Sequence, residues 1–224
     1  MIQLVFSSDL FALTDICIFS VSALVALLIA TRAFKAFSFS TESKHKYFSV
    51  AFLLLSSAFI VNAAVTFFKF YNLFERHSRG IAFYTFGAIS SSQALAGFGT
   101  LAFRLLLIGG LLGIFHVIEN SKSIKQVLLT YLFASMITIL SIKHFFAFYV
   151  MTLALCALIT YRFYVNHIQK ESSKTATLTS GFFLITLSQA GMLLAPLETV
   201  YTLASLVQLL GFTLLLATYI QLVK

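Results

Sequence analysis

The chain has 224 residues, of which 60% are hydrophobic and 10% are charged, and its mean hydropathy is +0.98. A soluble domain carries roughly 25% charged residues, so this composition excludes a soluble fold. The net charge of +8 does not indicate nucleic-acid binding, because the basic residues are scattered at the ends of apolar segments. We therefore expect a multi-pass protein of the cell membrane, plasma or cytoplasmic, whose partner is the lipid bilayer and not a nucleic acid.

The apolar runs are long and uninterrupted, which indicates helices; the strands of a closed membrane barrel would alternate apolar and polar residues. About 20 apolar residues are needed to cross roughly 30 Å of hydrocarbon. By this measure we predict an all-α fold, a seven-transmembrane-helix bundle with one domain over residues 1–224. The predicted spans are about residues 10–30, 47–68, 92–118, 126–142, 144–161, 175–197 and 199–223.

The lysines and arginines predict the orientation, since cytoplasmic loops carry an excess of both. With the N-terminus outside and the C-terminus in the cytoplasm, ten basic residues lie inside, namely Arg32, Lys35, Lys44, Lys46, Lys122, Lys125, Arg162, Lys170, Lys174 and Lys224. Four lie outside, namely Lys69, Arg76, Arg79 and Lys143. Several tyrosines, Tyr149 and Tyr219 among them, fall near the predicted borders, where an amphipathic ring is well placed.

A faint internal similarity leaves open a gene duplication. Residues 21–60 align with residues 151–190, with matches such as Arg32 with Arg162 and Lys44 with Lys174. Three helices, a linker helix and three more helices would form a 3+1+3 parallel repeat. Chance similarity between two Leu- and Phe-rich segments explains the same matches.

The outline of seven spans is similar to that of microbial rhodopsins, of SWEET-type sugar carriers and of seven-helix sensor modules, in topology alone. The last predicted span contains Gln208 and no lysine before Lys224, so it offers no amine to hold retinal. The only proline is Pro196, which lies outside any Pro-Gln motif of the carriers. No family is assigned from these outlines.

Arg104 is the most informative residue, because it lies near the middle of the third predicted span. A charge at that depth costs at least about 2.5–3.5 kcal/mol on insertion scales, so it normally faces protein or trapped water. Four other polar residues reach the same outer half of the bundle, one on each of four other spans: Asp15, Asn62, Gln189 and Gln208. In the same span, Gly109 and Gly113 have the GxxxG spacing that suits close helix packing.

These five polar residues allow two interpretations. The first is an outward-facing ligand site in which Arg104 meets a carboxylate or phosphate. The second is a structural role, in which Arg104 pairs with Asp15 and the amides and fixes the register of the helices. Both interpretations predict buried polar contacts, so the sequence leaves the choice open.

The sequence predicts no metal, no cofactor and no enzyme activity. His45, His116, Glu119 and His167 all belong to the cytoplasmic ends, but they come from separate segments without a local ligand motif. No nucleophile–base pair, Gly-rich phosphate loop or paired carboxylates occur. Haem would need axial ligands within facing spans, and no histidine lies in the middle of one.

Three functions fit this picture. The first, which we favour, is a small-solute-binding bundle, a carrier or permease for a small anionic or lipid-like ligand. The second is a receptor or sensor that signals through a membrane or cytoplasmic protein partner. The third is a non-catalytic subunit of a membrane complex, because the fourth and fifth predicted spans are short and Phe145, Phe146 and Phe148 could meet protein.

Overall fold

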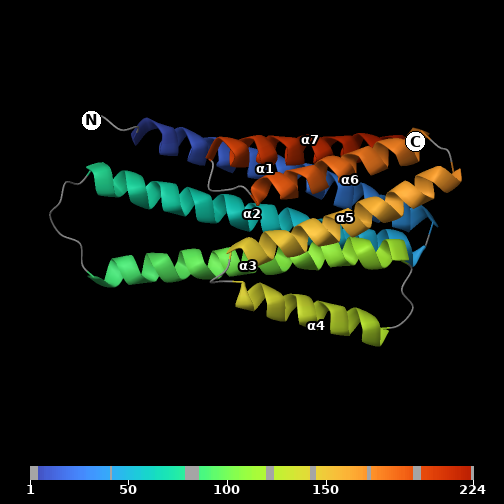
Figure 1. The fold of residues 1–224 in the computed structure, drawn as a ribbon, viewed down its shortest axis with the longest axis horizontal. Coiled ribbons are helices and arrows are strands. Elements are labelled where there is room, and N and C mark those ends of the chain that lie inside the picture. Colours follow the sequence, from blue (N-terminus) through green and yellow to red (C-terminus); the bar gives the residue numbers. More distant parts are fainter. Residues whose placement is uncertain are drawn as a thin grey trace.

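The computed structural model describes residues 5–40, 42–78, 86–119, 124–141, 145–170, 173–193 and 198–222. These residues form seven helices (Figure 1): α1 (Val5–Ser40), α2 (Ser43–Ser78), α3 (Phe86–Glu119), α4 (Ile124–Leu140), α5 (Phe145–Lys170), α6 (Ser173–Met192) and α7 (Glu198–Leu222). The prediction of an all-α fold is confirmed over this part of the chain.

Several helices are longer than the predicted membrane spans. α1 and α2 each have 36 residues, and α5 has 26 residues where the sequence predicted a span of residues 144–161. The additional residues of α5 include Arg162 and Gln169, which are good helix formers but too polar to count as part of an apolar run. Hydropathy therefore locates the apolar part of each helix and misses its polar ends.

Within the described residues, five helices are long and apolar enough to cross a membrane, and they belong to α1, α2, α3, α5 and α7. α4 is a shorter apolar helix of 17 residues. α6 has 20 residues and is rich in Ser and Thr. The five long apolar helices make the chain a membrane protein, and the two shorter helices pack beside them.

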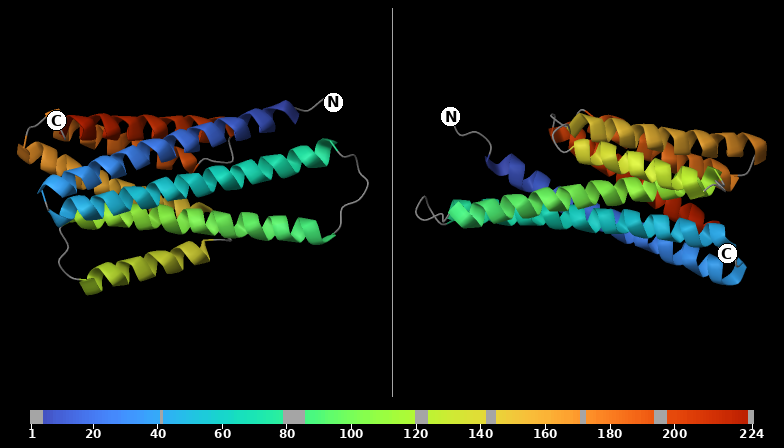
Figure 2. Two further views of the ribbon diagram at one scale, coloured as in Figure 1. Left: turned by 180° about the vertical axis from the view of Figure 1, so that it is seen from behind. Right: turned by 90° about the horizontal axis from the view of Figure 1, so that it is seen from below.

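The helices form a ring with α4 outside it. Contacts run from α1 to α2, α3, α5, α6 and α7 in turn, and α7 returns to α1, whereas α4 touches only α3 and α5 among the described helices. The edge-on view in Figure 2 separates α5 and α6 from the layer that contains α1 and α2. The N-terminus and the connection between α2 and α3 lie at one end, and the connection between α5 and α6 lies at the other (Figure 1).

The α1–α2 contact is built from small residues. Ala26, Ala30 and Ala33 of α1 are buried, as are Ser49 and Ser56 of α2. Two serines of α2 also bond across the interface: the Ser49 hydroxyl donates to the carbonyl oxygen of Ala30, and the Ser56 hydroxyl donates to that of Ala23, both at 2.8 Å. Small side chains let two backbones approach closely, which is how helices associate in a membrane.

Aromatic rings fill the space between α1, α2 and α7. The Phe59 ring stacks on Phe19 at 6.2 Å and meets the edge of Phe212 at 5.2 Å, measured between ring centroids. About three turns nearer the start of α2, Phe48 stacks on Tyr219 at 5.6 Å. These rings hold α7 against the α1–α2 pair.

Candidate functional site

Arg104 is buried within the bundle and does not face lipid. It lies on α3 with 7% of its surface exposed. Its Nη1 group donates a hydrogen bond of 2.8 Å to the carbonyl oxygen of Ser141 and lies 3.3 Å from the Ser141 hydroxyl. The expectation that a charge at this depth is sheltered by protein is therefore met by the structure.

The partners of Arg104 explain how α4 is attached to the ring. Ser141 directly follows the end of α4, where the last carbonyl groups carry partial negative charge. The guanidinium also lies over the Phe148 ring of α5, with 5.0 Å between its carbon and the ring centroid. A cation on an aromatic face is attracted to the ring quadrupole. Arg104 thus joins α3, α4 and α5 at one point.

Asp15 does not form an ion pair with Arg104. No ion pair of Arg104 with a carboxylate occurs among the described residues, and the buried Oδ1 atom of Asp15 has no hydrogen-bond partner. α1, which carries Asp15, contacts α2 and α7 but not α3, so no described helix contact brings the carboxylate to the guanidinium.

The two predicted glutamines meet each other. Gln189 of α6 donates from Nε2 to Oε1 of Gln208 of α7 at 3.4 Å, and its own Oε1 accepts from the hydroxyl of Thr152 of α5 at 3.1 Å. All three side chains are buried. This chain of amide and hydroxyl groups connects α5, α6 and α7 and is separate from the hydrogen bonds of Arg104.

Replacement of Gln189 by leucine is expected to destabilise the bundle by about 1–2 kcal/mol, because it leaves the buried amide of Gln208 without this partner, whereas the Thr152 hydroxyl can still donate to the carbonyl oxygen of Tyr149. Unfolding in a denaturing detergent measures the change. Leu187→Ala is the control, since that side chain of α6 is 52% exposed and packs little. Equal stability of the Gln189 and Leu187 variants would show that the amide contacts are not structural.

Asn62 stands apart from the other four residues. It is half-buried on α2, and among the described side chains it makes no hydrogen bond to the arginine, the aspartate or the glutamines. The structure thus joins two of the five predicted positions, Gln189 and Gln208, by a hydrogen bond. Among the described side chains no hydrogen bond or ion pair joins Arg104, Asp15 and Asn62 to one another.

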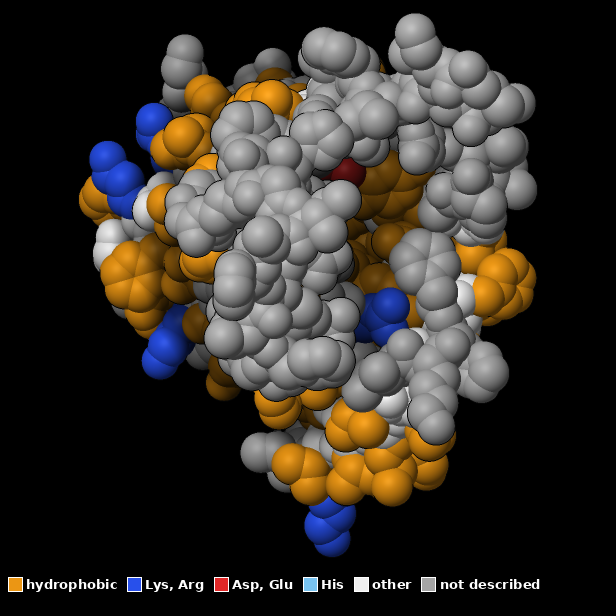
Figure 3. Space-filling view, turned by 90° about the vertical axis from the view of Figure 1, so that its left-hand side faces the viewer, with side chains coloured by type: hydrophobic (Ala, Val, Ile, Leu, Met, Phe, Trp, Pro, Cys, Tyr) orange, Lys and Arg blue, Asp and Glu red, His pale blue; other side chains and the backbone are white. Residues whose placement is uncertain are grey.

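A hollow opens near these residues at one end of the molecule. Figure 3 views the bundle from the end that carries the N-terminus, and it shows hydrophobic side chains within a depression, with a basic side chain at one side and an acidic one near its rim. Opposite charges thus border one recess.

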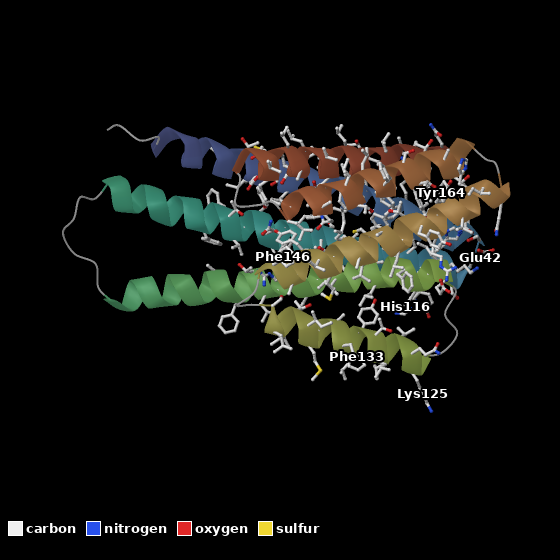
Figure 4. The ribbon with its side chains drawn as sticks, in the orientation of Figure 1. Glu42, His116, Lys125, Phe133, Phe146 and Tyr164 are labelled. Atoms are coloured by element: carbon white, nitrogen blue, oxygen red, sulfur yellow. The ribbon has the colours of Figure 1, made fainter. Side chains whose placement is uncertain are left out.

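The histidines and the acid at the other end do not form a metal site within the described residues. Glu119 instead pairs with Arg162 at 2.7 Å, and His167 bonds to the hydroxyl of Thr175 at 3.0 Å. His116 lies between α3 and α4 (Figure 4), where its ring stacks on Tyr131 with 5.9 Å between centroids. Glu119 and His167 thus have polar partners on neighbouring helices, whereas the buried ring nitrogens of His116 have no hydrogen-bond partner.

Sequence reasoning missed the direct partners of Arg104. Ser141 and Phe148 carry no sequence signal for this role, because the arginine meets a backbone carbonyl and a ring face. Tyr149 was expected at a membrane border, and this is wrong: it is 8% exposed and lies in the core beside the arginine. Tyr219 was also expected at a border and is buried against Phe48.

Comparisons with protein-family models, curated proteins and solved structures found no match to this chain. The assignment of a function therefore depends on the geometry of the described residues.

Proposed function

We propose that the protein is a small-solute-binding bundle, a carrier or permease, and that Arg104 binds an anionic group of its solute. One observation carries the proposal: a buried guanidinium has no carboxylate partner among the described side chains. A charge inside a membrane protein is a candidate functional site by default, also where it bonds to a backbone carbonyl as Arg104 does. The proposal includes no catalytic step.

The hydrogen-bonding capacity of Arg104 supports this role. The contact with Ser141 uses Nη1, and within the described part of the chain no hydrogen bond uses Nε or Nη2. A guanidinium presents its donors as a planar fork that matches a carboxylate or a phosphate. The negative end of α4 offsets only about half a charge, so an anion remains favourable beside Arg104.

Asp15 would give the site a second charged group. The carboxylate would disfavour a large negative charge and would leave room for a solute that carries one anionic group. The solute class is therefore a small monoanion or a lipid with one anionic group.

The proposal places all seven helices across the cell membrane, with the N-terminus outside and with α4 as the linker of a 3+1+3 arrangement. At about 1.5 Å per residue, the 17 residues of α4 extend about 26 Å, close to the hydrocarbon thickness. Lysine and arginine are in excess at the helix ends on the side of the α5–α6 connection. This excess supports a cytoplasmic location of that side. A tag after Lys224 should bind antibody only after the cells are permeabilised. Labelling of intact cells would contradict the proposed orientation.

Thermal unfolding of the purified protein tests solute binding. Acetate, inorganic phosphate and octyl phosphate are compared with the neutral compounds acetamide, glycerol and octanol. A ligand at ten times its dissociation constant adds about 1.4 kcal/mol to stability, which raises the midpoint by about 3–6 °C. We expect this shift from at least one anion, followed by uptake of that anion into proteoliposomes. Equal shifts from the neutral compounds, or none from any anion, would contradict the proposal, and binding without uptake would point to a receptor.

A further inference from the structure

A second site lies far from Arg104, on the outer surface between α5 and α6. It is a groove of about 610 Å³, and its lining includes Ala157, Thr160 and Tyr164 of α5 and Ala176, Ser180 and Phe183 of α6. Of the five long apolar helices, α5 buries the least of its apolar window, 28% against 39–44% in the others. The groove therefore faces the medium that surrounds the bundle, which in a membrane is lipid.

The length of the groove matches one leaflet. Its α5 wall runs from Ala157 to His167, which corresponds to about 15 Å along a helix. The hydrocarbon of a bilayer is roughly 30 Å thick, so the groove covers about half of it. Tyr164 marks the end near the α5–α6 connection (Figure 4).

The polar groups of the groove are satisfied along most of its length. The hydroxyl oxygens of Thr160 and Thr186 lie 2.8 Å apart, and each lies within hydrogen-bond distance of a carbonyl oxygen one turn earlier in its own helix. Each hydroxyl proton therefore has an acceptor, either the other hydroxyl or the carbonyl oxygen. Thr179 likewise donates to the carbonyl of Thr175 at 2.8 Å. These threonines need no polar ligand, so an acyl chain can lie against them without leaving a polar group unpaired.

Toward the α5–α6 connection, the groove has hydroxyls that make no hydrogen bond among the residues that the structure describes. They belong to Tyr161 and Tyr164, both more than half exposed, and to the exposed Ser180 of α6. His167 uses Nδ1 for Thr175, which leaves Nε2 for another partner. The groove is thus apolar in the depth of the leaflet and rich in donors at its surface.

We propose that this groove binds one phospholipid, with an acyl chain between Ala157 and Phe183 and the phosphodiester at Tyr164 and His167. The gradient from apolar wall to free donors matches the gradient of a lipid from chain to headgroup. The leaflet is the one on the side of the α5–α6 connection. This site is independent of Arg104 and of the proposed solute.

Native mass spectrometry of the detergent-purified chain, titrated with phosphatidylglycerol, tests the inference. We expect one retained lipid per chain. The double variant Ala157→Phe and Ser180→Phe fills the groove from two exposed positions and should lower retention at least fivefold. Leu132→Phe places the same ring on the exposed face of α4 and should leave retention unchanged. Equal retention by all three proteins, or no retained lipid in the unaltered chain, would overturn the site.

Two further measurements separate the alternatives. Tyr164→Phe should weaken retention about tenfold, the worth of one hydrogen bond to a charged group. The unaltered chain should retain diacylglycerol with the same acyl chains no better than the groove-filled variant retains phosphatidylglycerol. Equal retention of diacylglycerol and phosphatidylglycerol by the unaltered chain would overturn the headgroup assignment. A dimer that disappears when the groove is filled would show that a second copy of the chain occupies it, which also overturns the inference.

Discussion

Replacement of Arg104 by glutamine is expected to weaken anion binding ten- to hundredfold and to reduce uptake by the same factor. The reason is the loss of a charge-assisted contact, which is worth about 1.5–3 kcal/mol. Arg104→Lys keeps the charge but replaces the planar fork with a point charge, so we expect an intermediate affinity. The dissociation constant from thermal unfolding and the initial rate of uptake in proteoliposomes check both variants.

The Arg104 variants require controls, because replacing Arg104 also removes the contact with Ser141 that attaches α4 to the ring. Arg162→Gln removes an exposed arginine that pairs with Glu119, and it should change neither anion affinity nor uptake. Phe148→Leu removes the ring beneath the guanidinium while leaving its charge, and it should preserve binding within a few-fold. A folded Arg104→Gln protein with unaltered affinity would leave Arg104 a purely structural residue.

Replacement of Gly110 by valine is expected to prevent the normal packing of α3 against α2. A Cβ atom at this position would lie 2.6 Å from Leu55 and 2.9 Å from the backbone oxygen of Ala51. Backbone cannot yield as a flexible side chain does, so the helices must separate, at a cost of about 1–3 kcal/mol or more. The yield of monodisperse protein and its unfolding in denaturing detergent measure the loss.

Gly109 offers a matched control in the same helix. Its nearest neighbour would be a Leu54 methyl group at 3.7 Å, which is an ordinary contact. Gly109→Ala should therefore cost nothing and gain up to about 1 kcal/mol of helix propensity. Similar losses in the Gly109 and Gly110 variants would mean that close approach does not determine the effect.

These glycines show what the sequence could predict and what it could not. The GxxxG spacing correctly indicated that one face of this helix packs closely, but the tightest contacts with Ala51 are those of Gly110 and Gly113. Spacing identifies candidates on a helix, and the rotation of that helix decides which of them face a neighbour. The same limit explains why Tyr149 was expected at a border and lies in the core.

For the predicted polar site, too, the sequence could predict one part and not another. Burial of Arg104 followed from the cost of placing a charge in hydrocarbon, which depends on the residue alone. Its partners depend on where another helix ends, and the carbonyl of Ser141 has no signature in sequence. The pair of Gln189 and Gln208 lay within reach of sequence reasoning, since two amides on neighbouring helices tend to meet. Whether any of these positions binds a solute stays a prediction.

The small-residue contact between α1 and α2 has a consequence for biosynthesis. Its alanines and both of its cross-helix serine bonds lie within α1 and the first half of α2, so the interface is complete before the later helices are made. α7, which closes the ring against α1, follows all of the other described helices in the chain. During translation the nascent bundle therefore presents an open side along α1, and the Phe59–Phe212 contact forms only when the last described helix enters the bilayer.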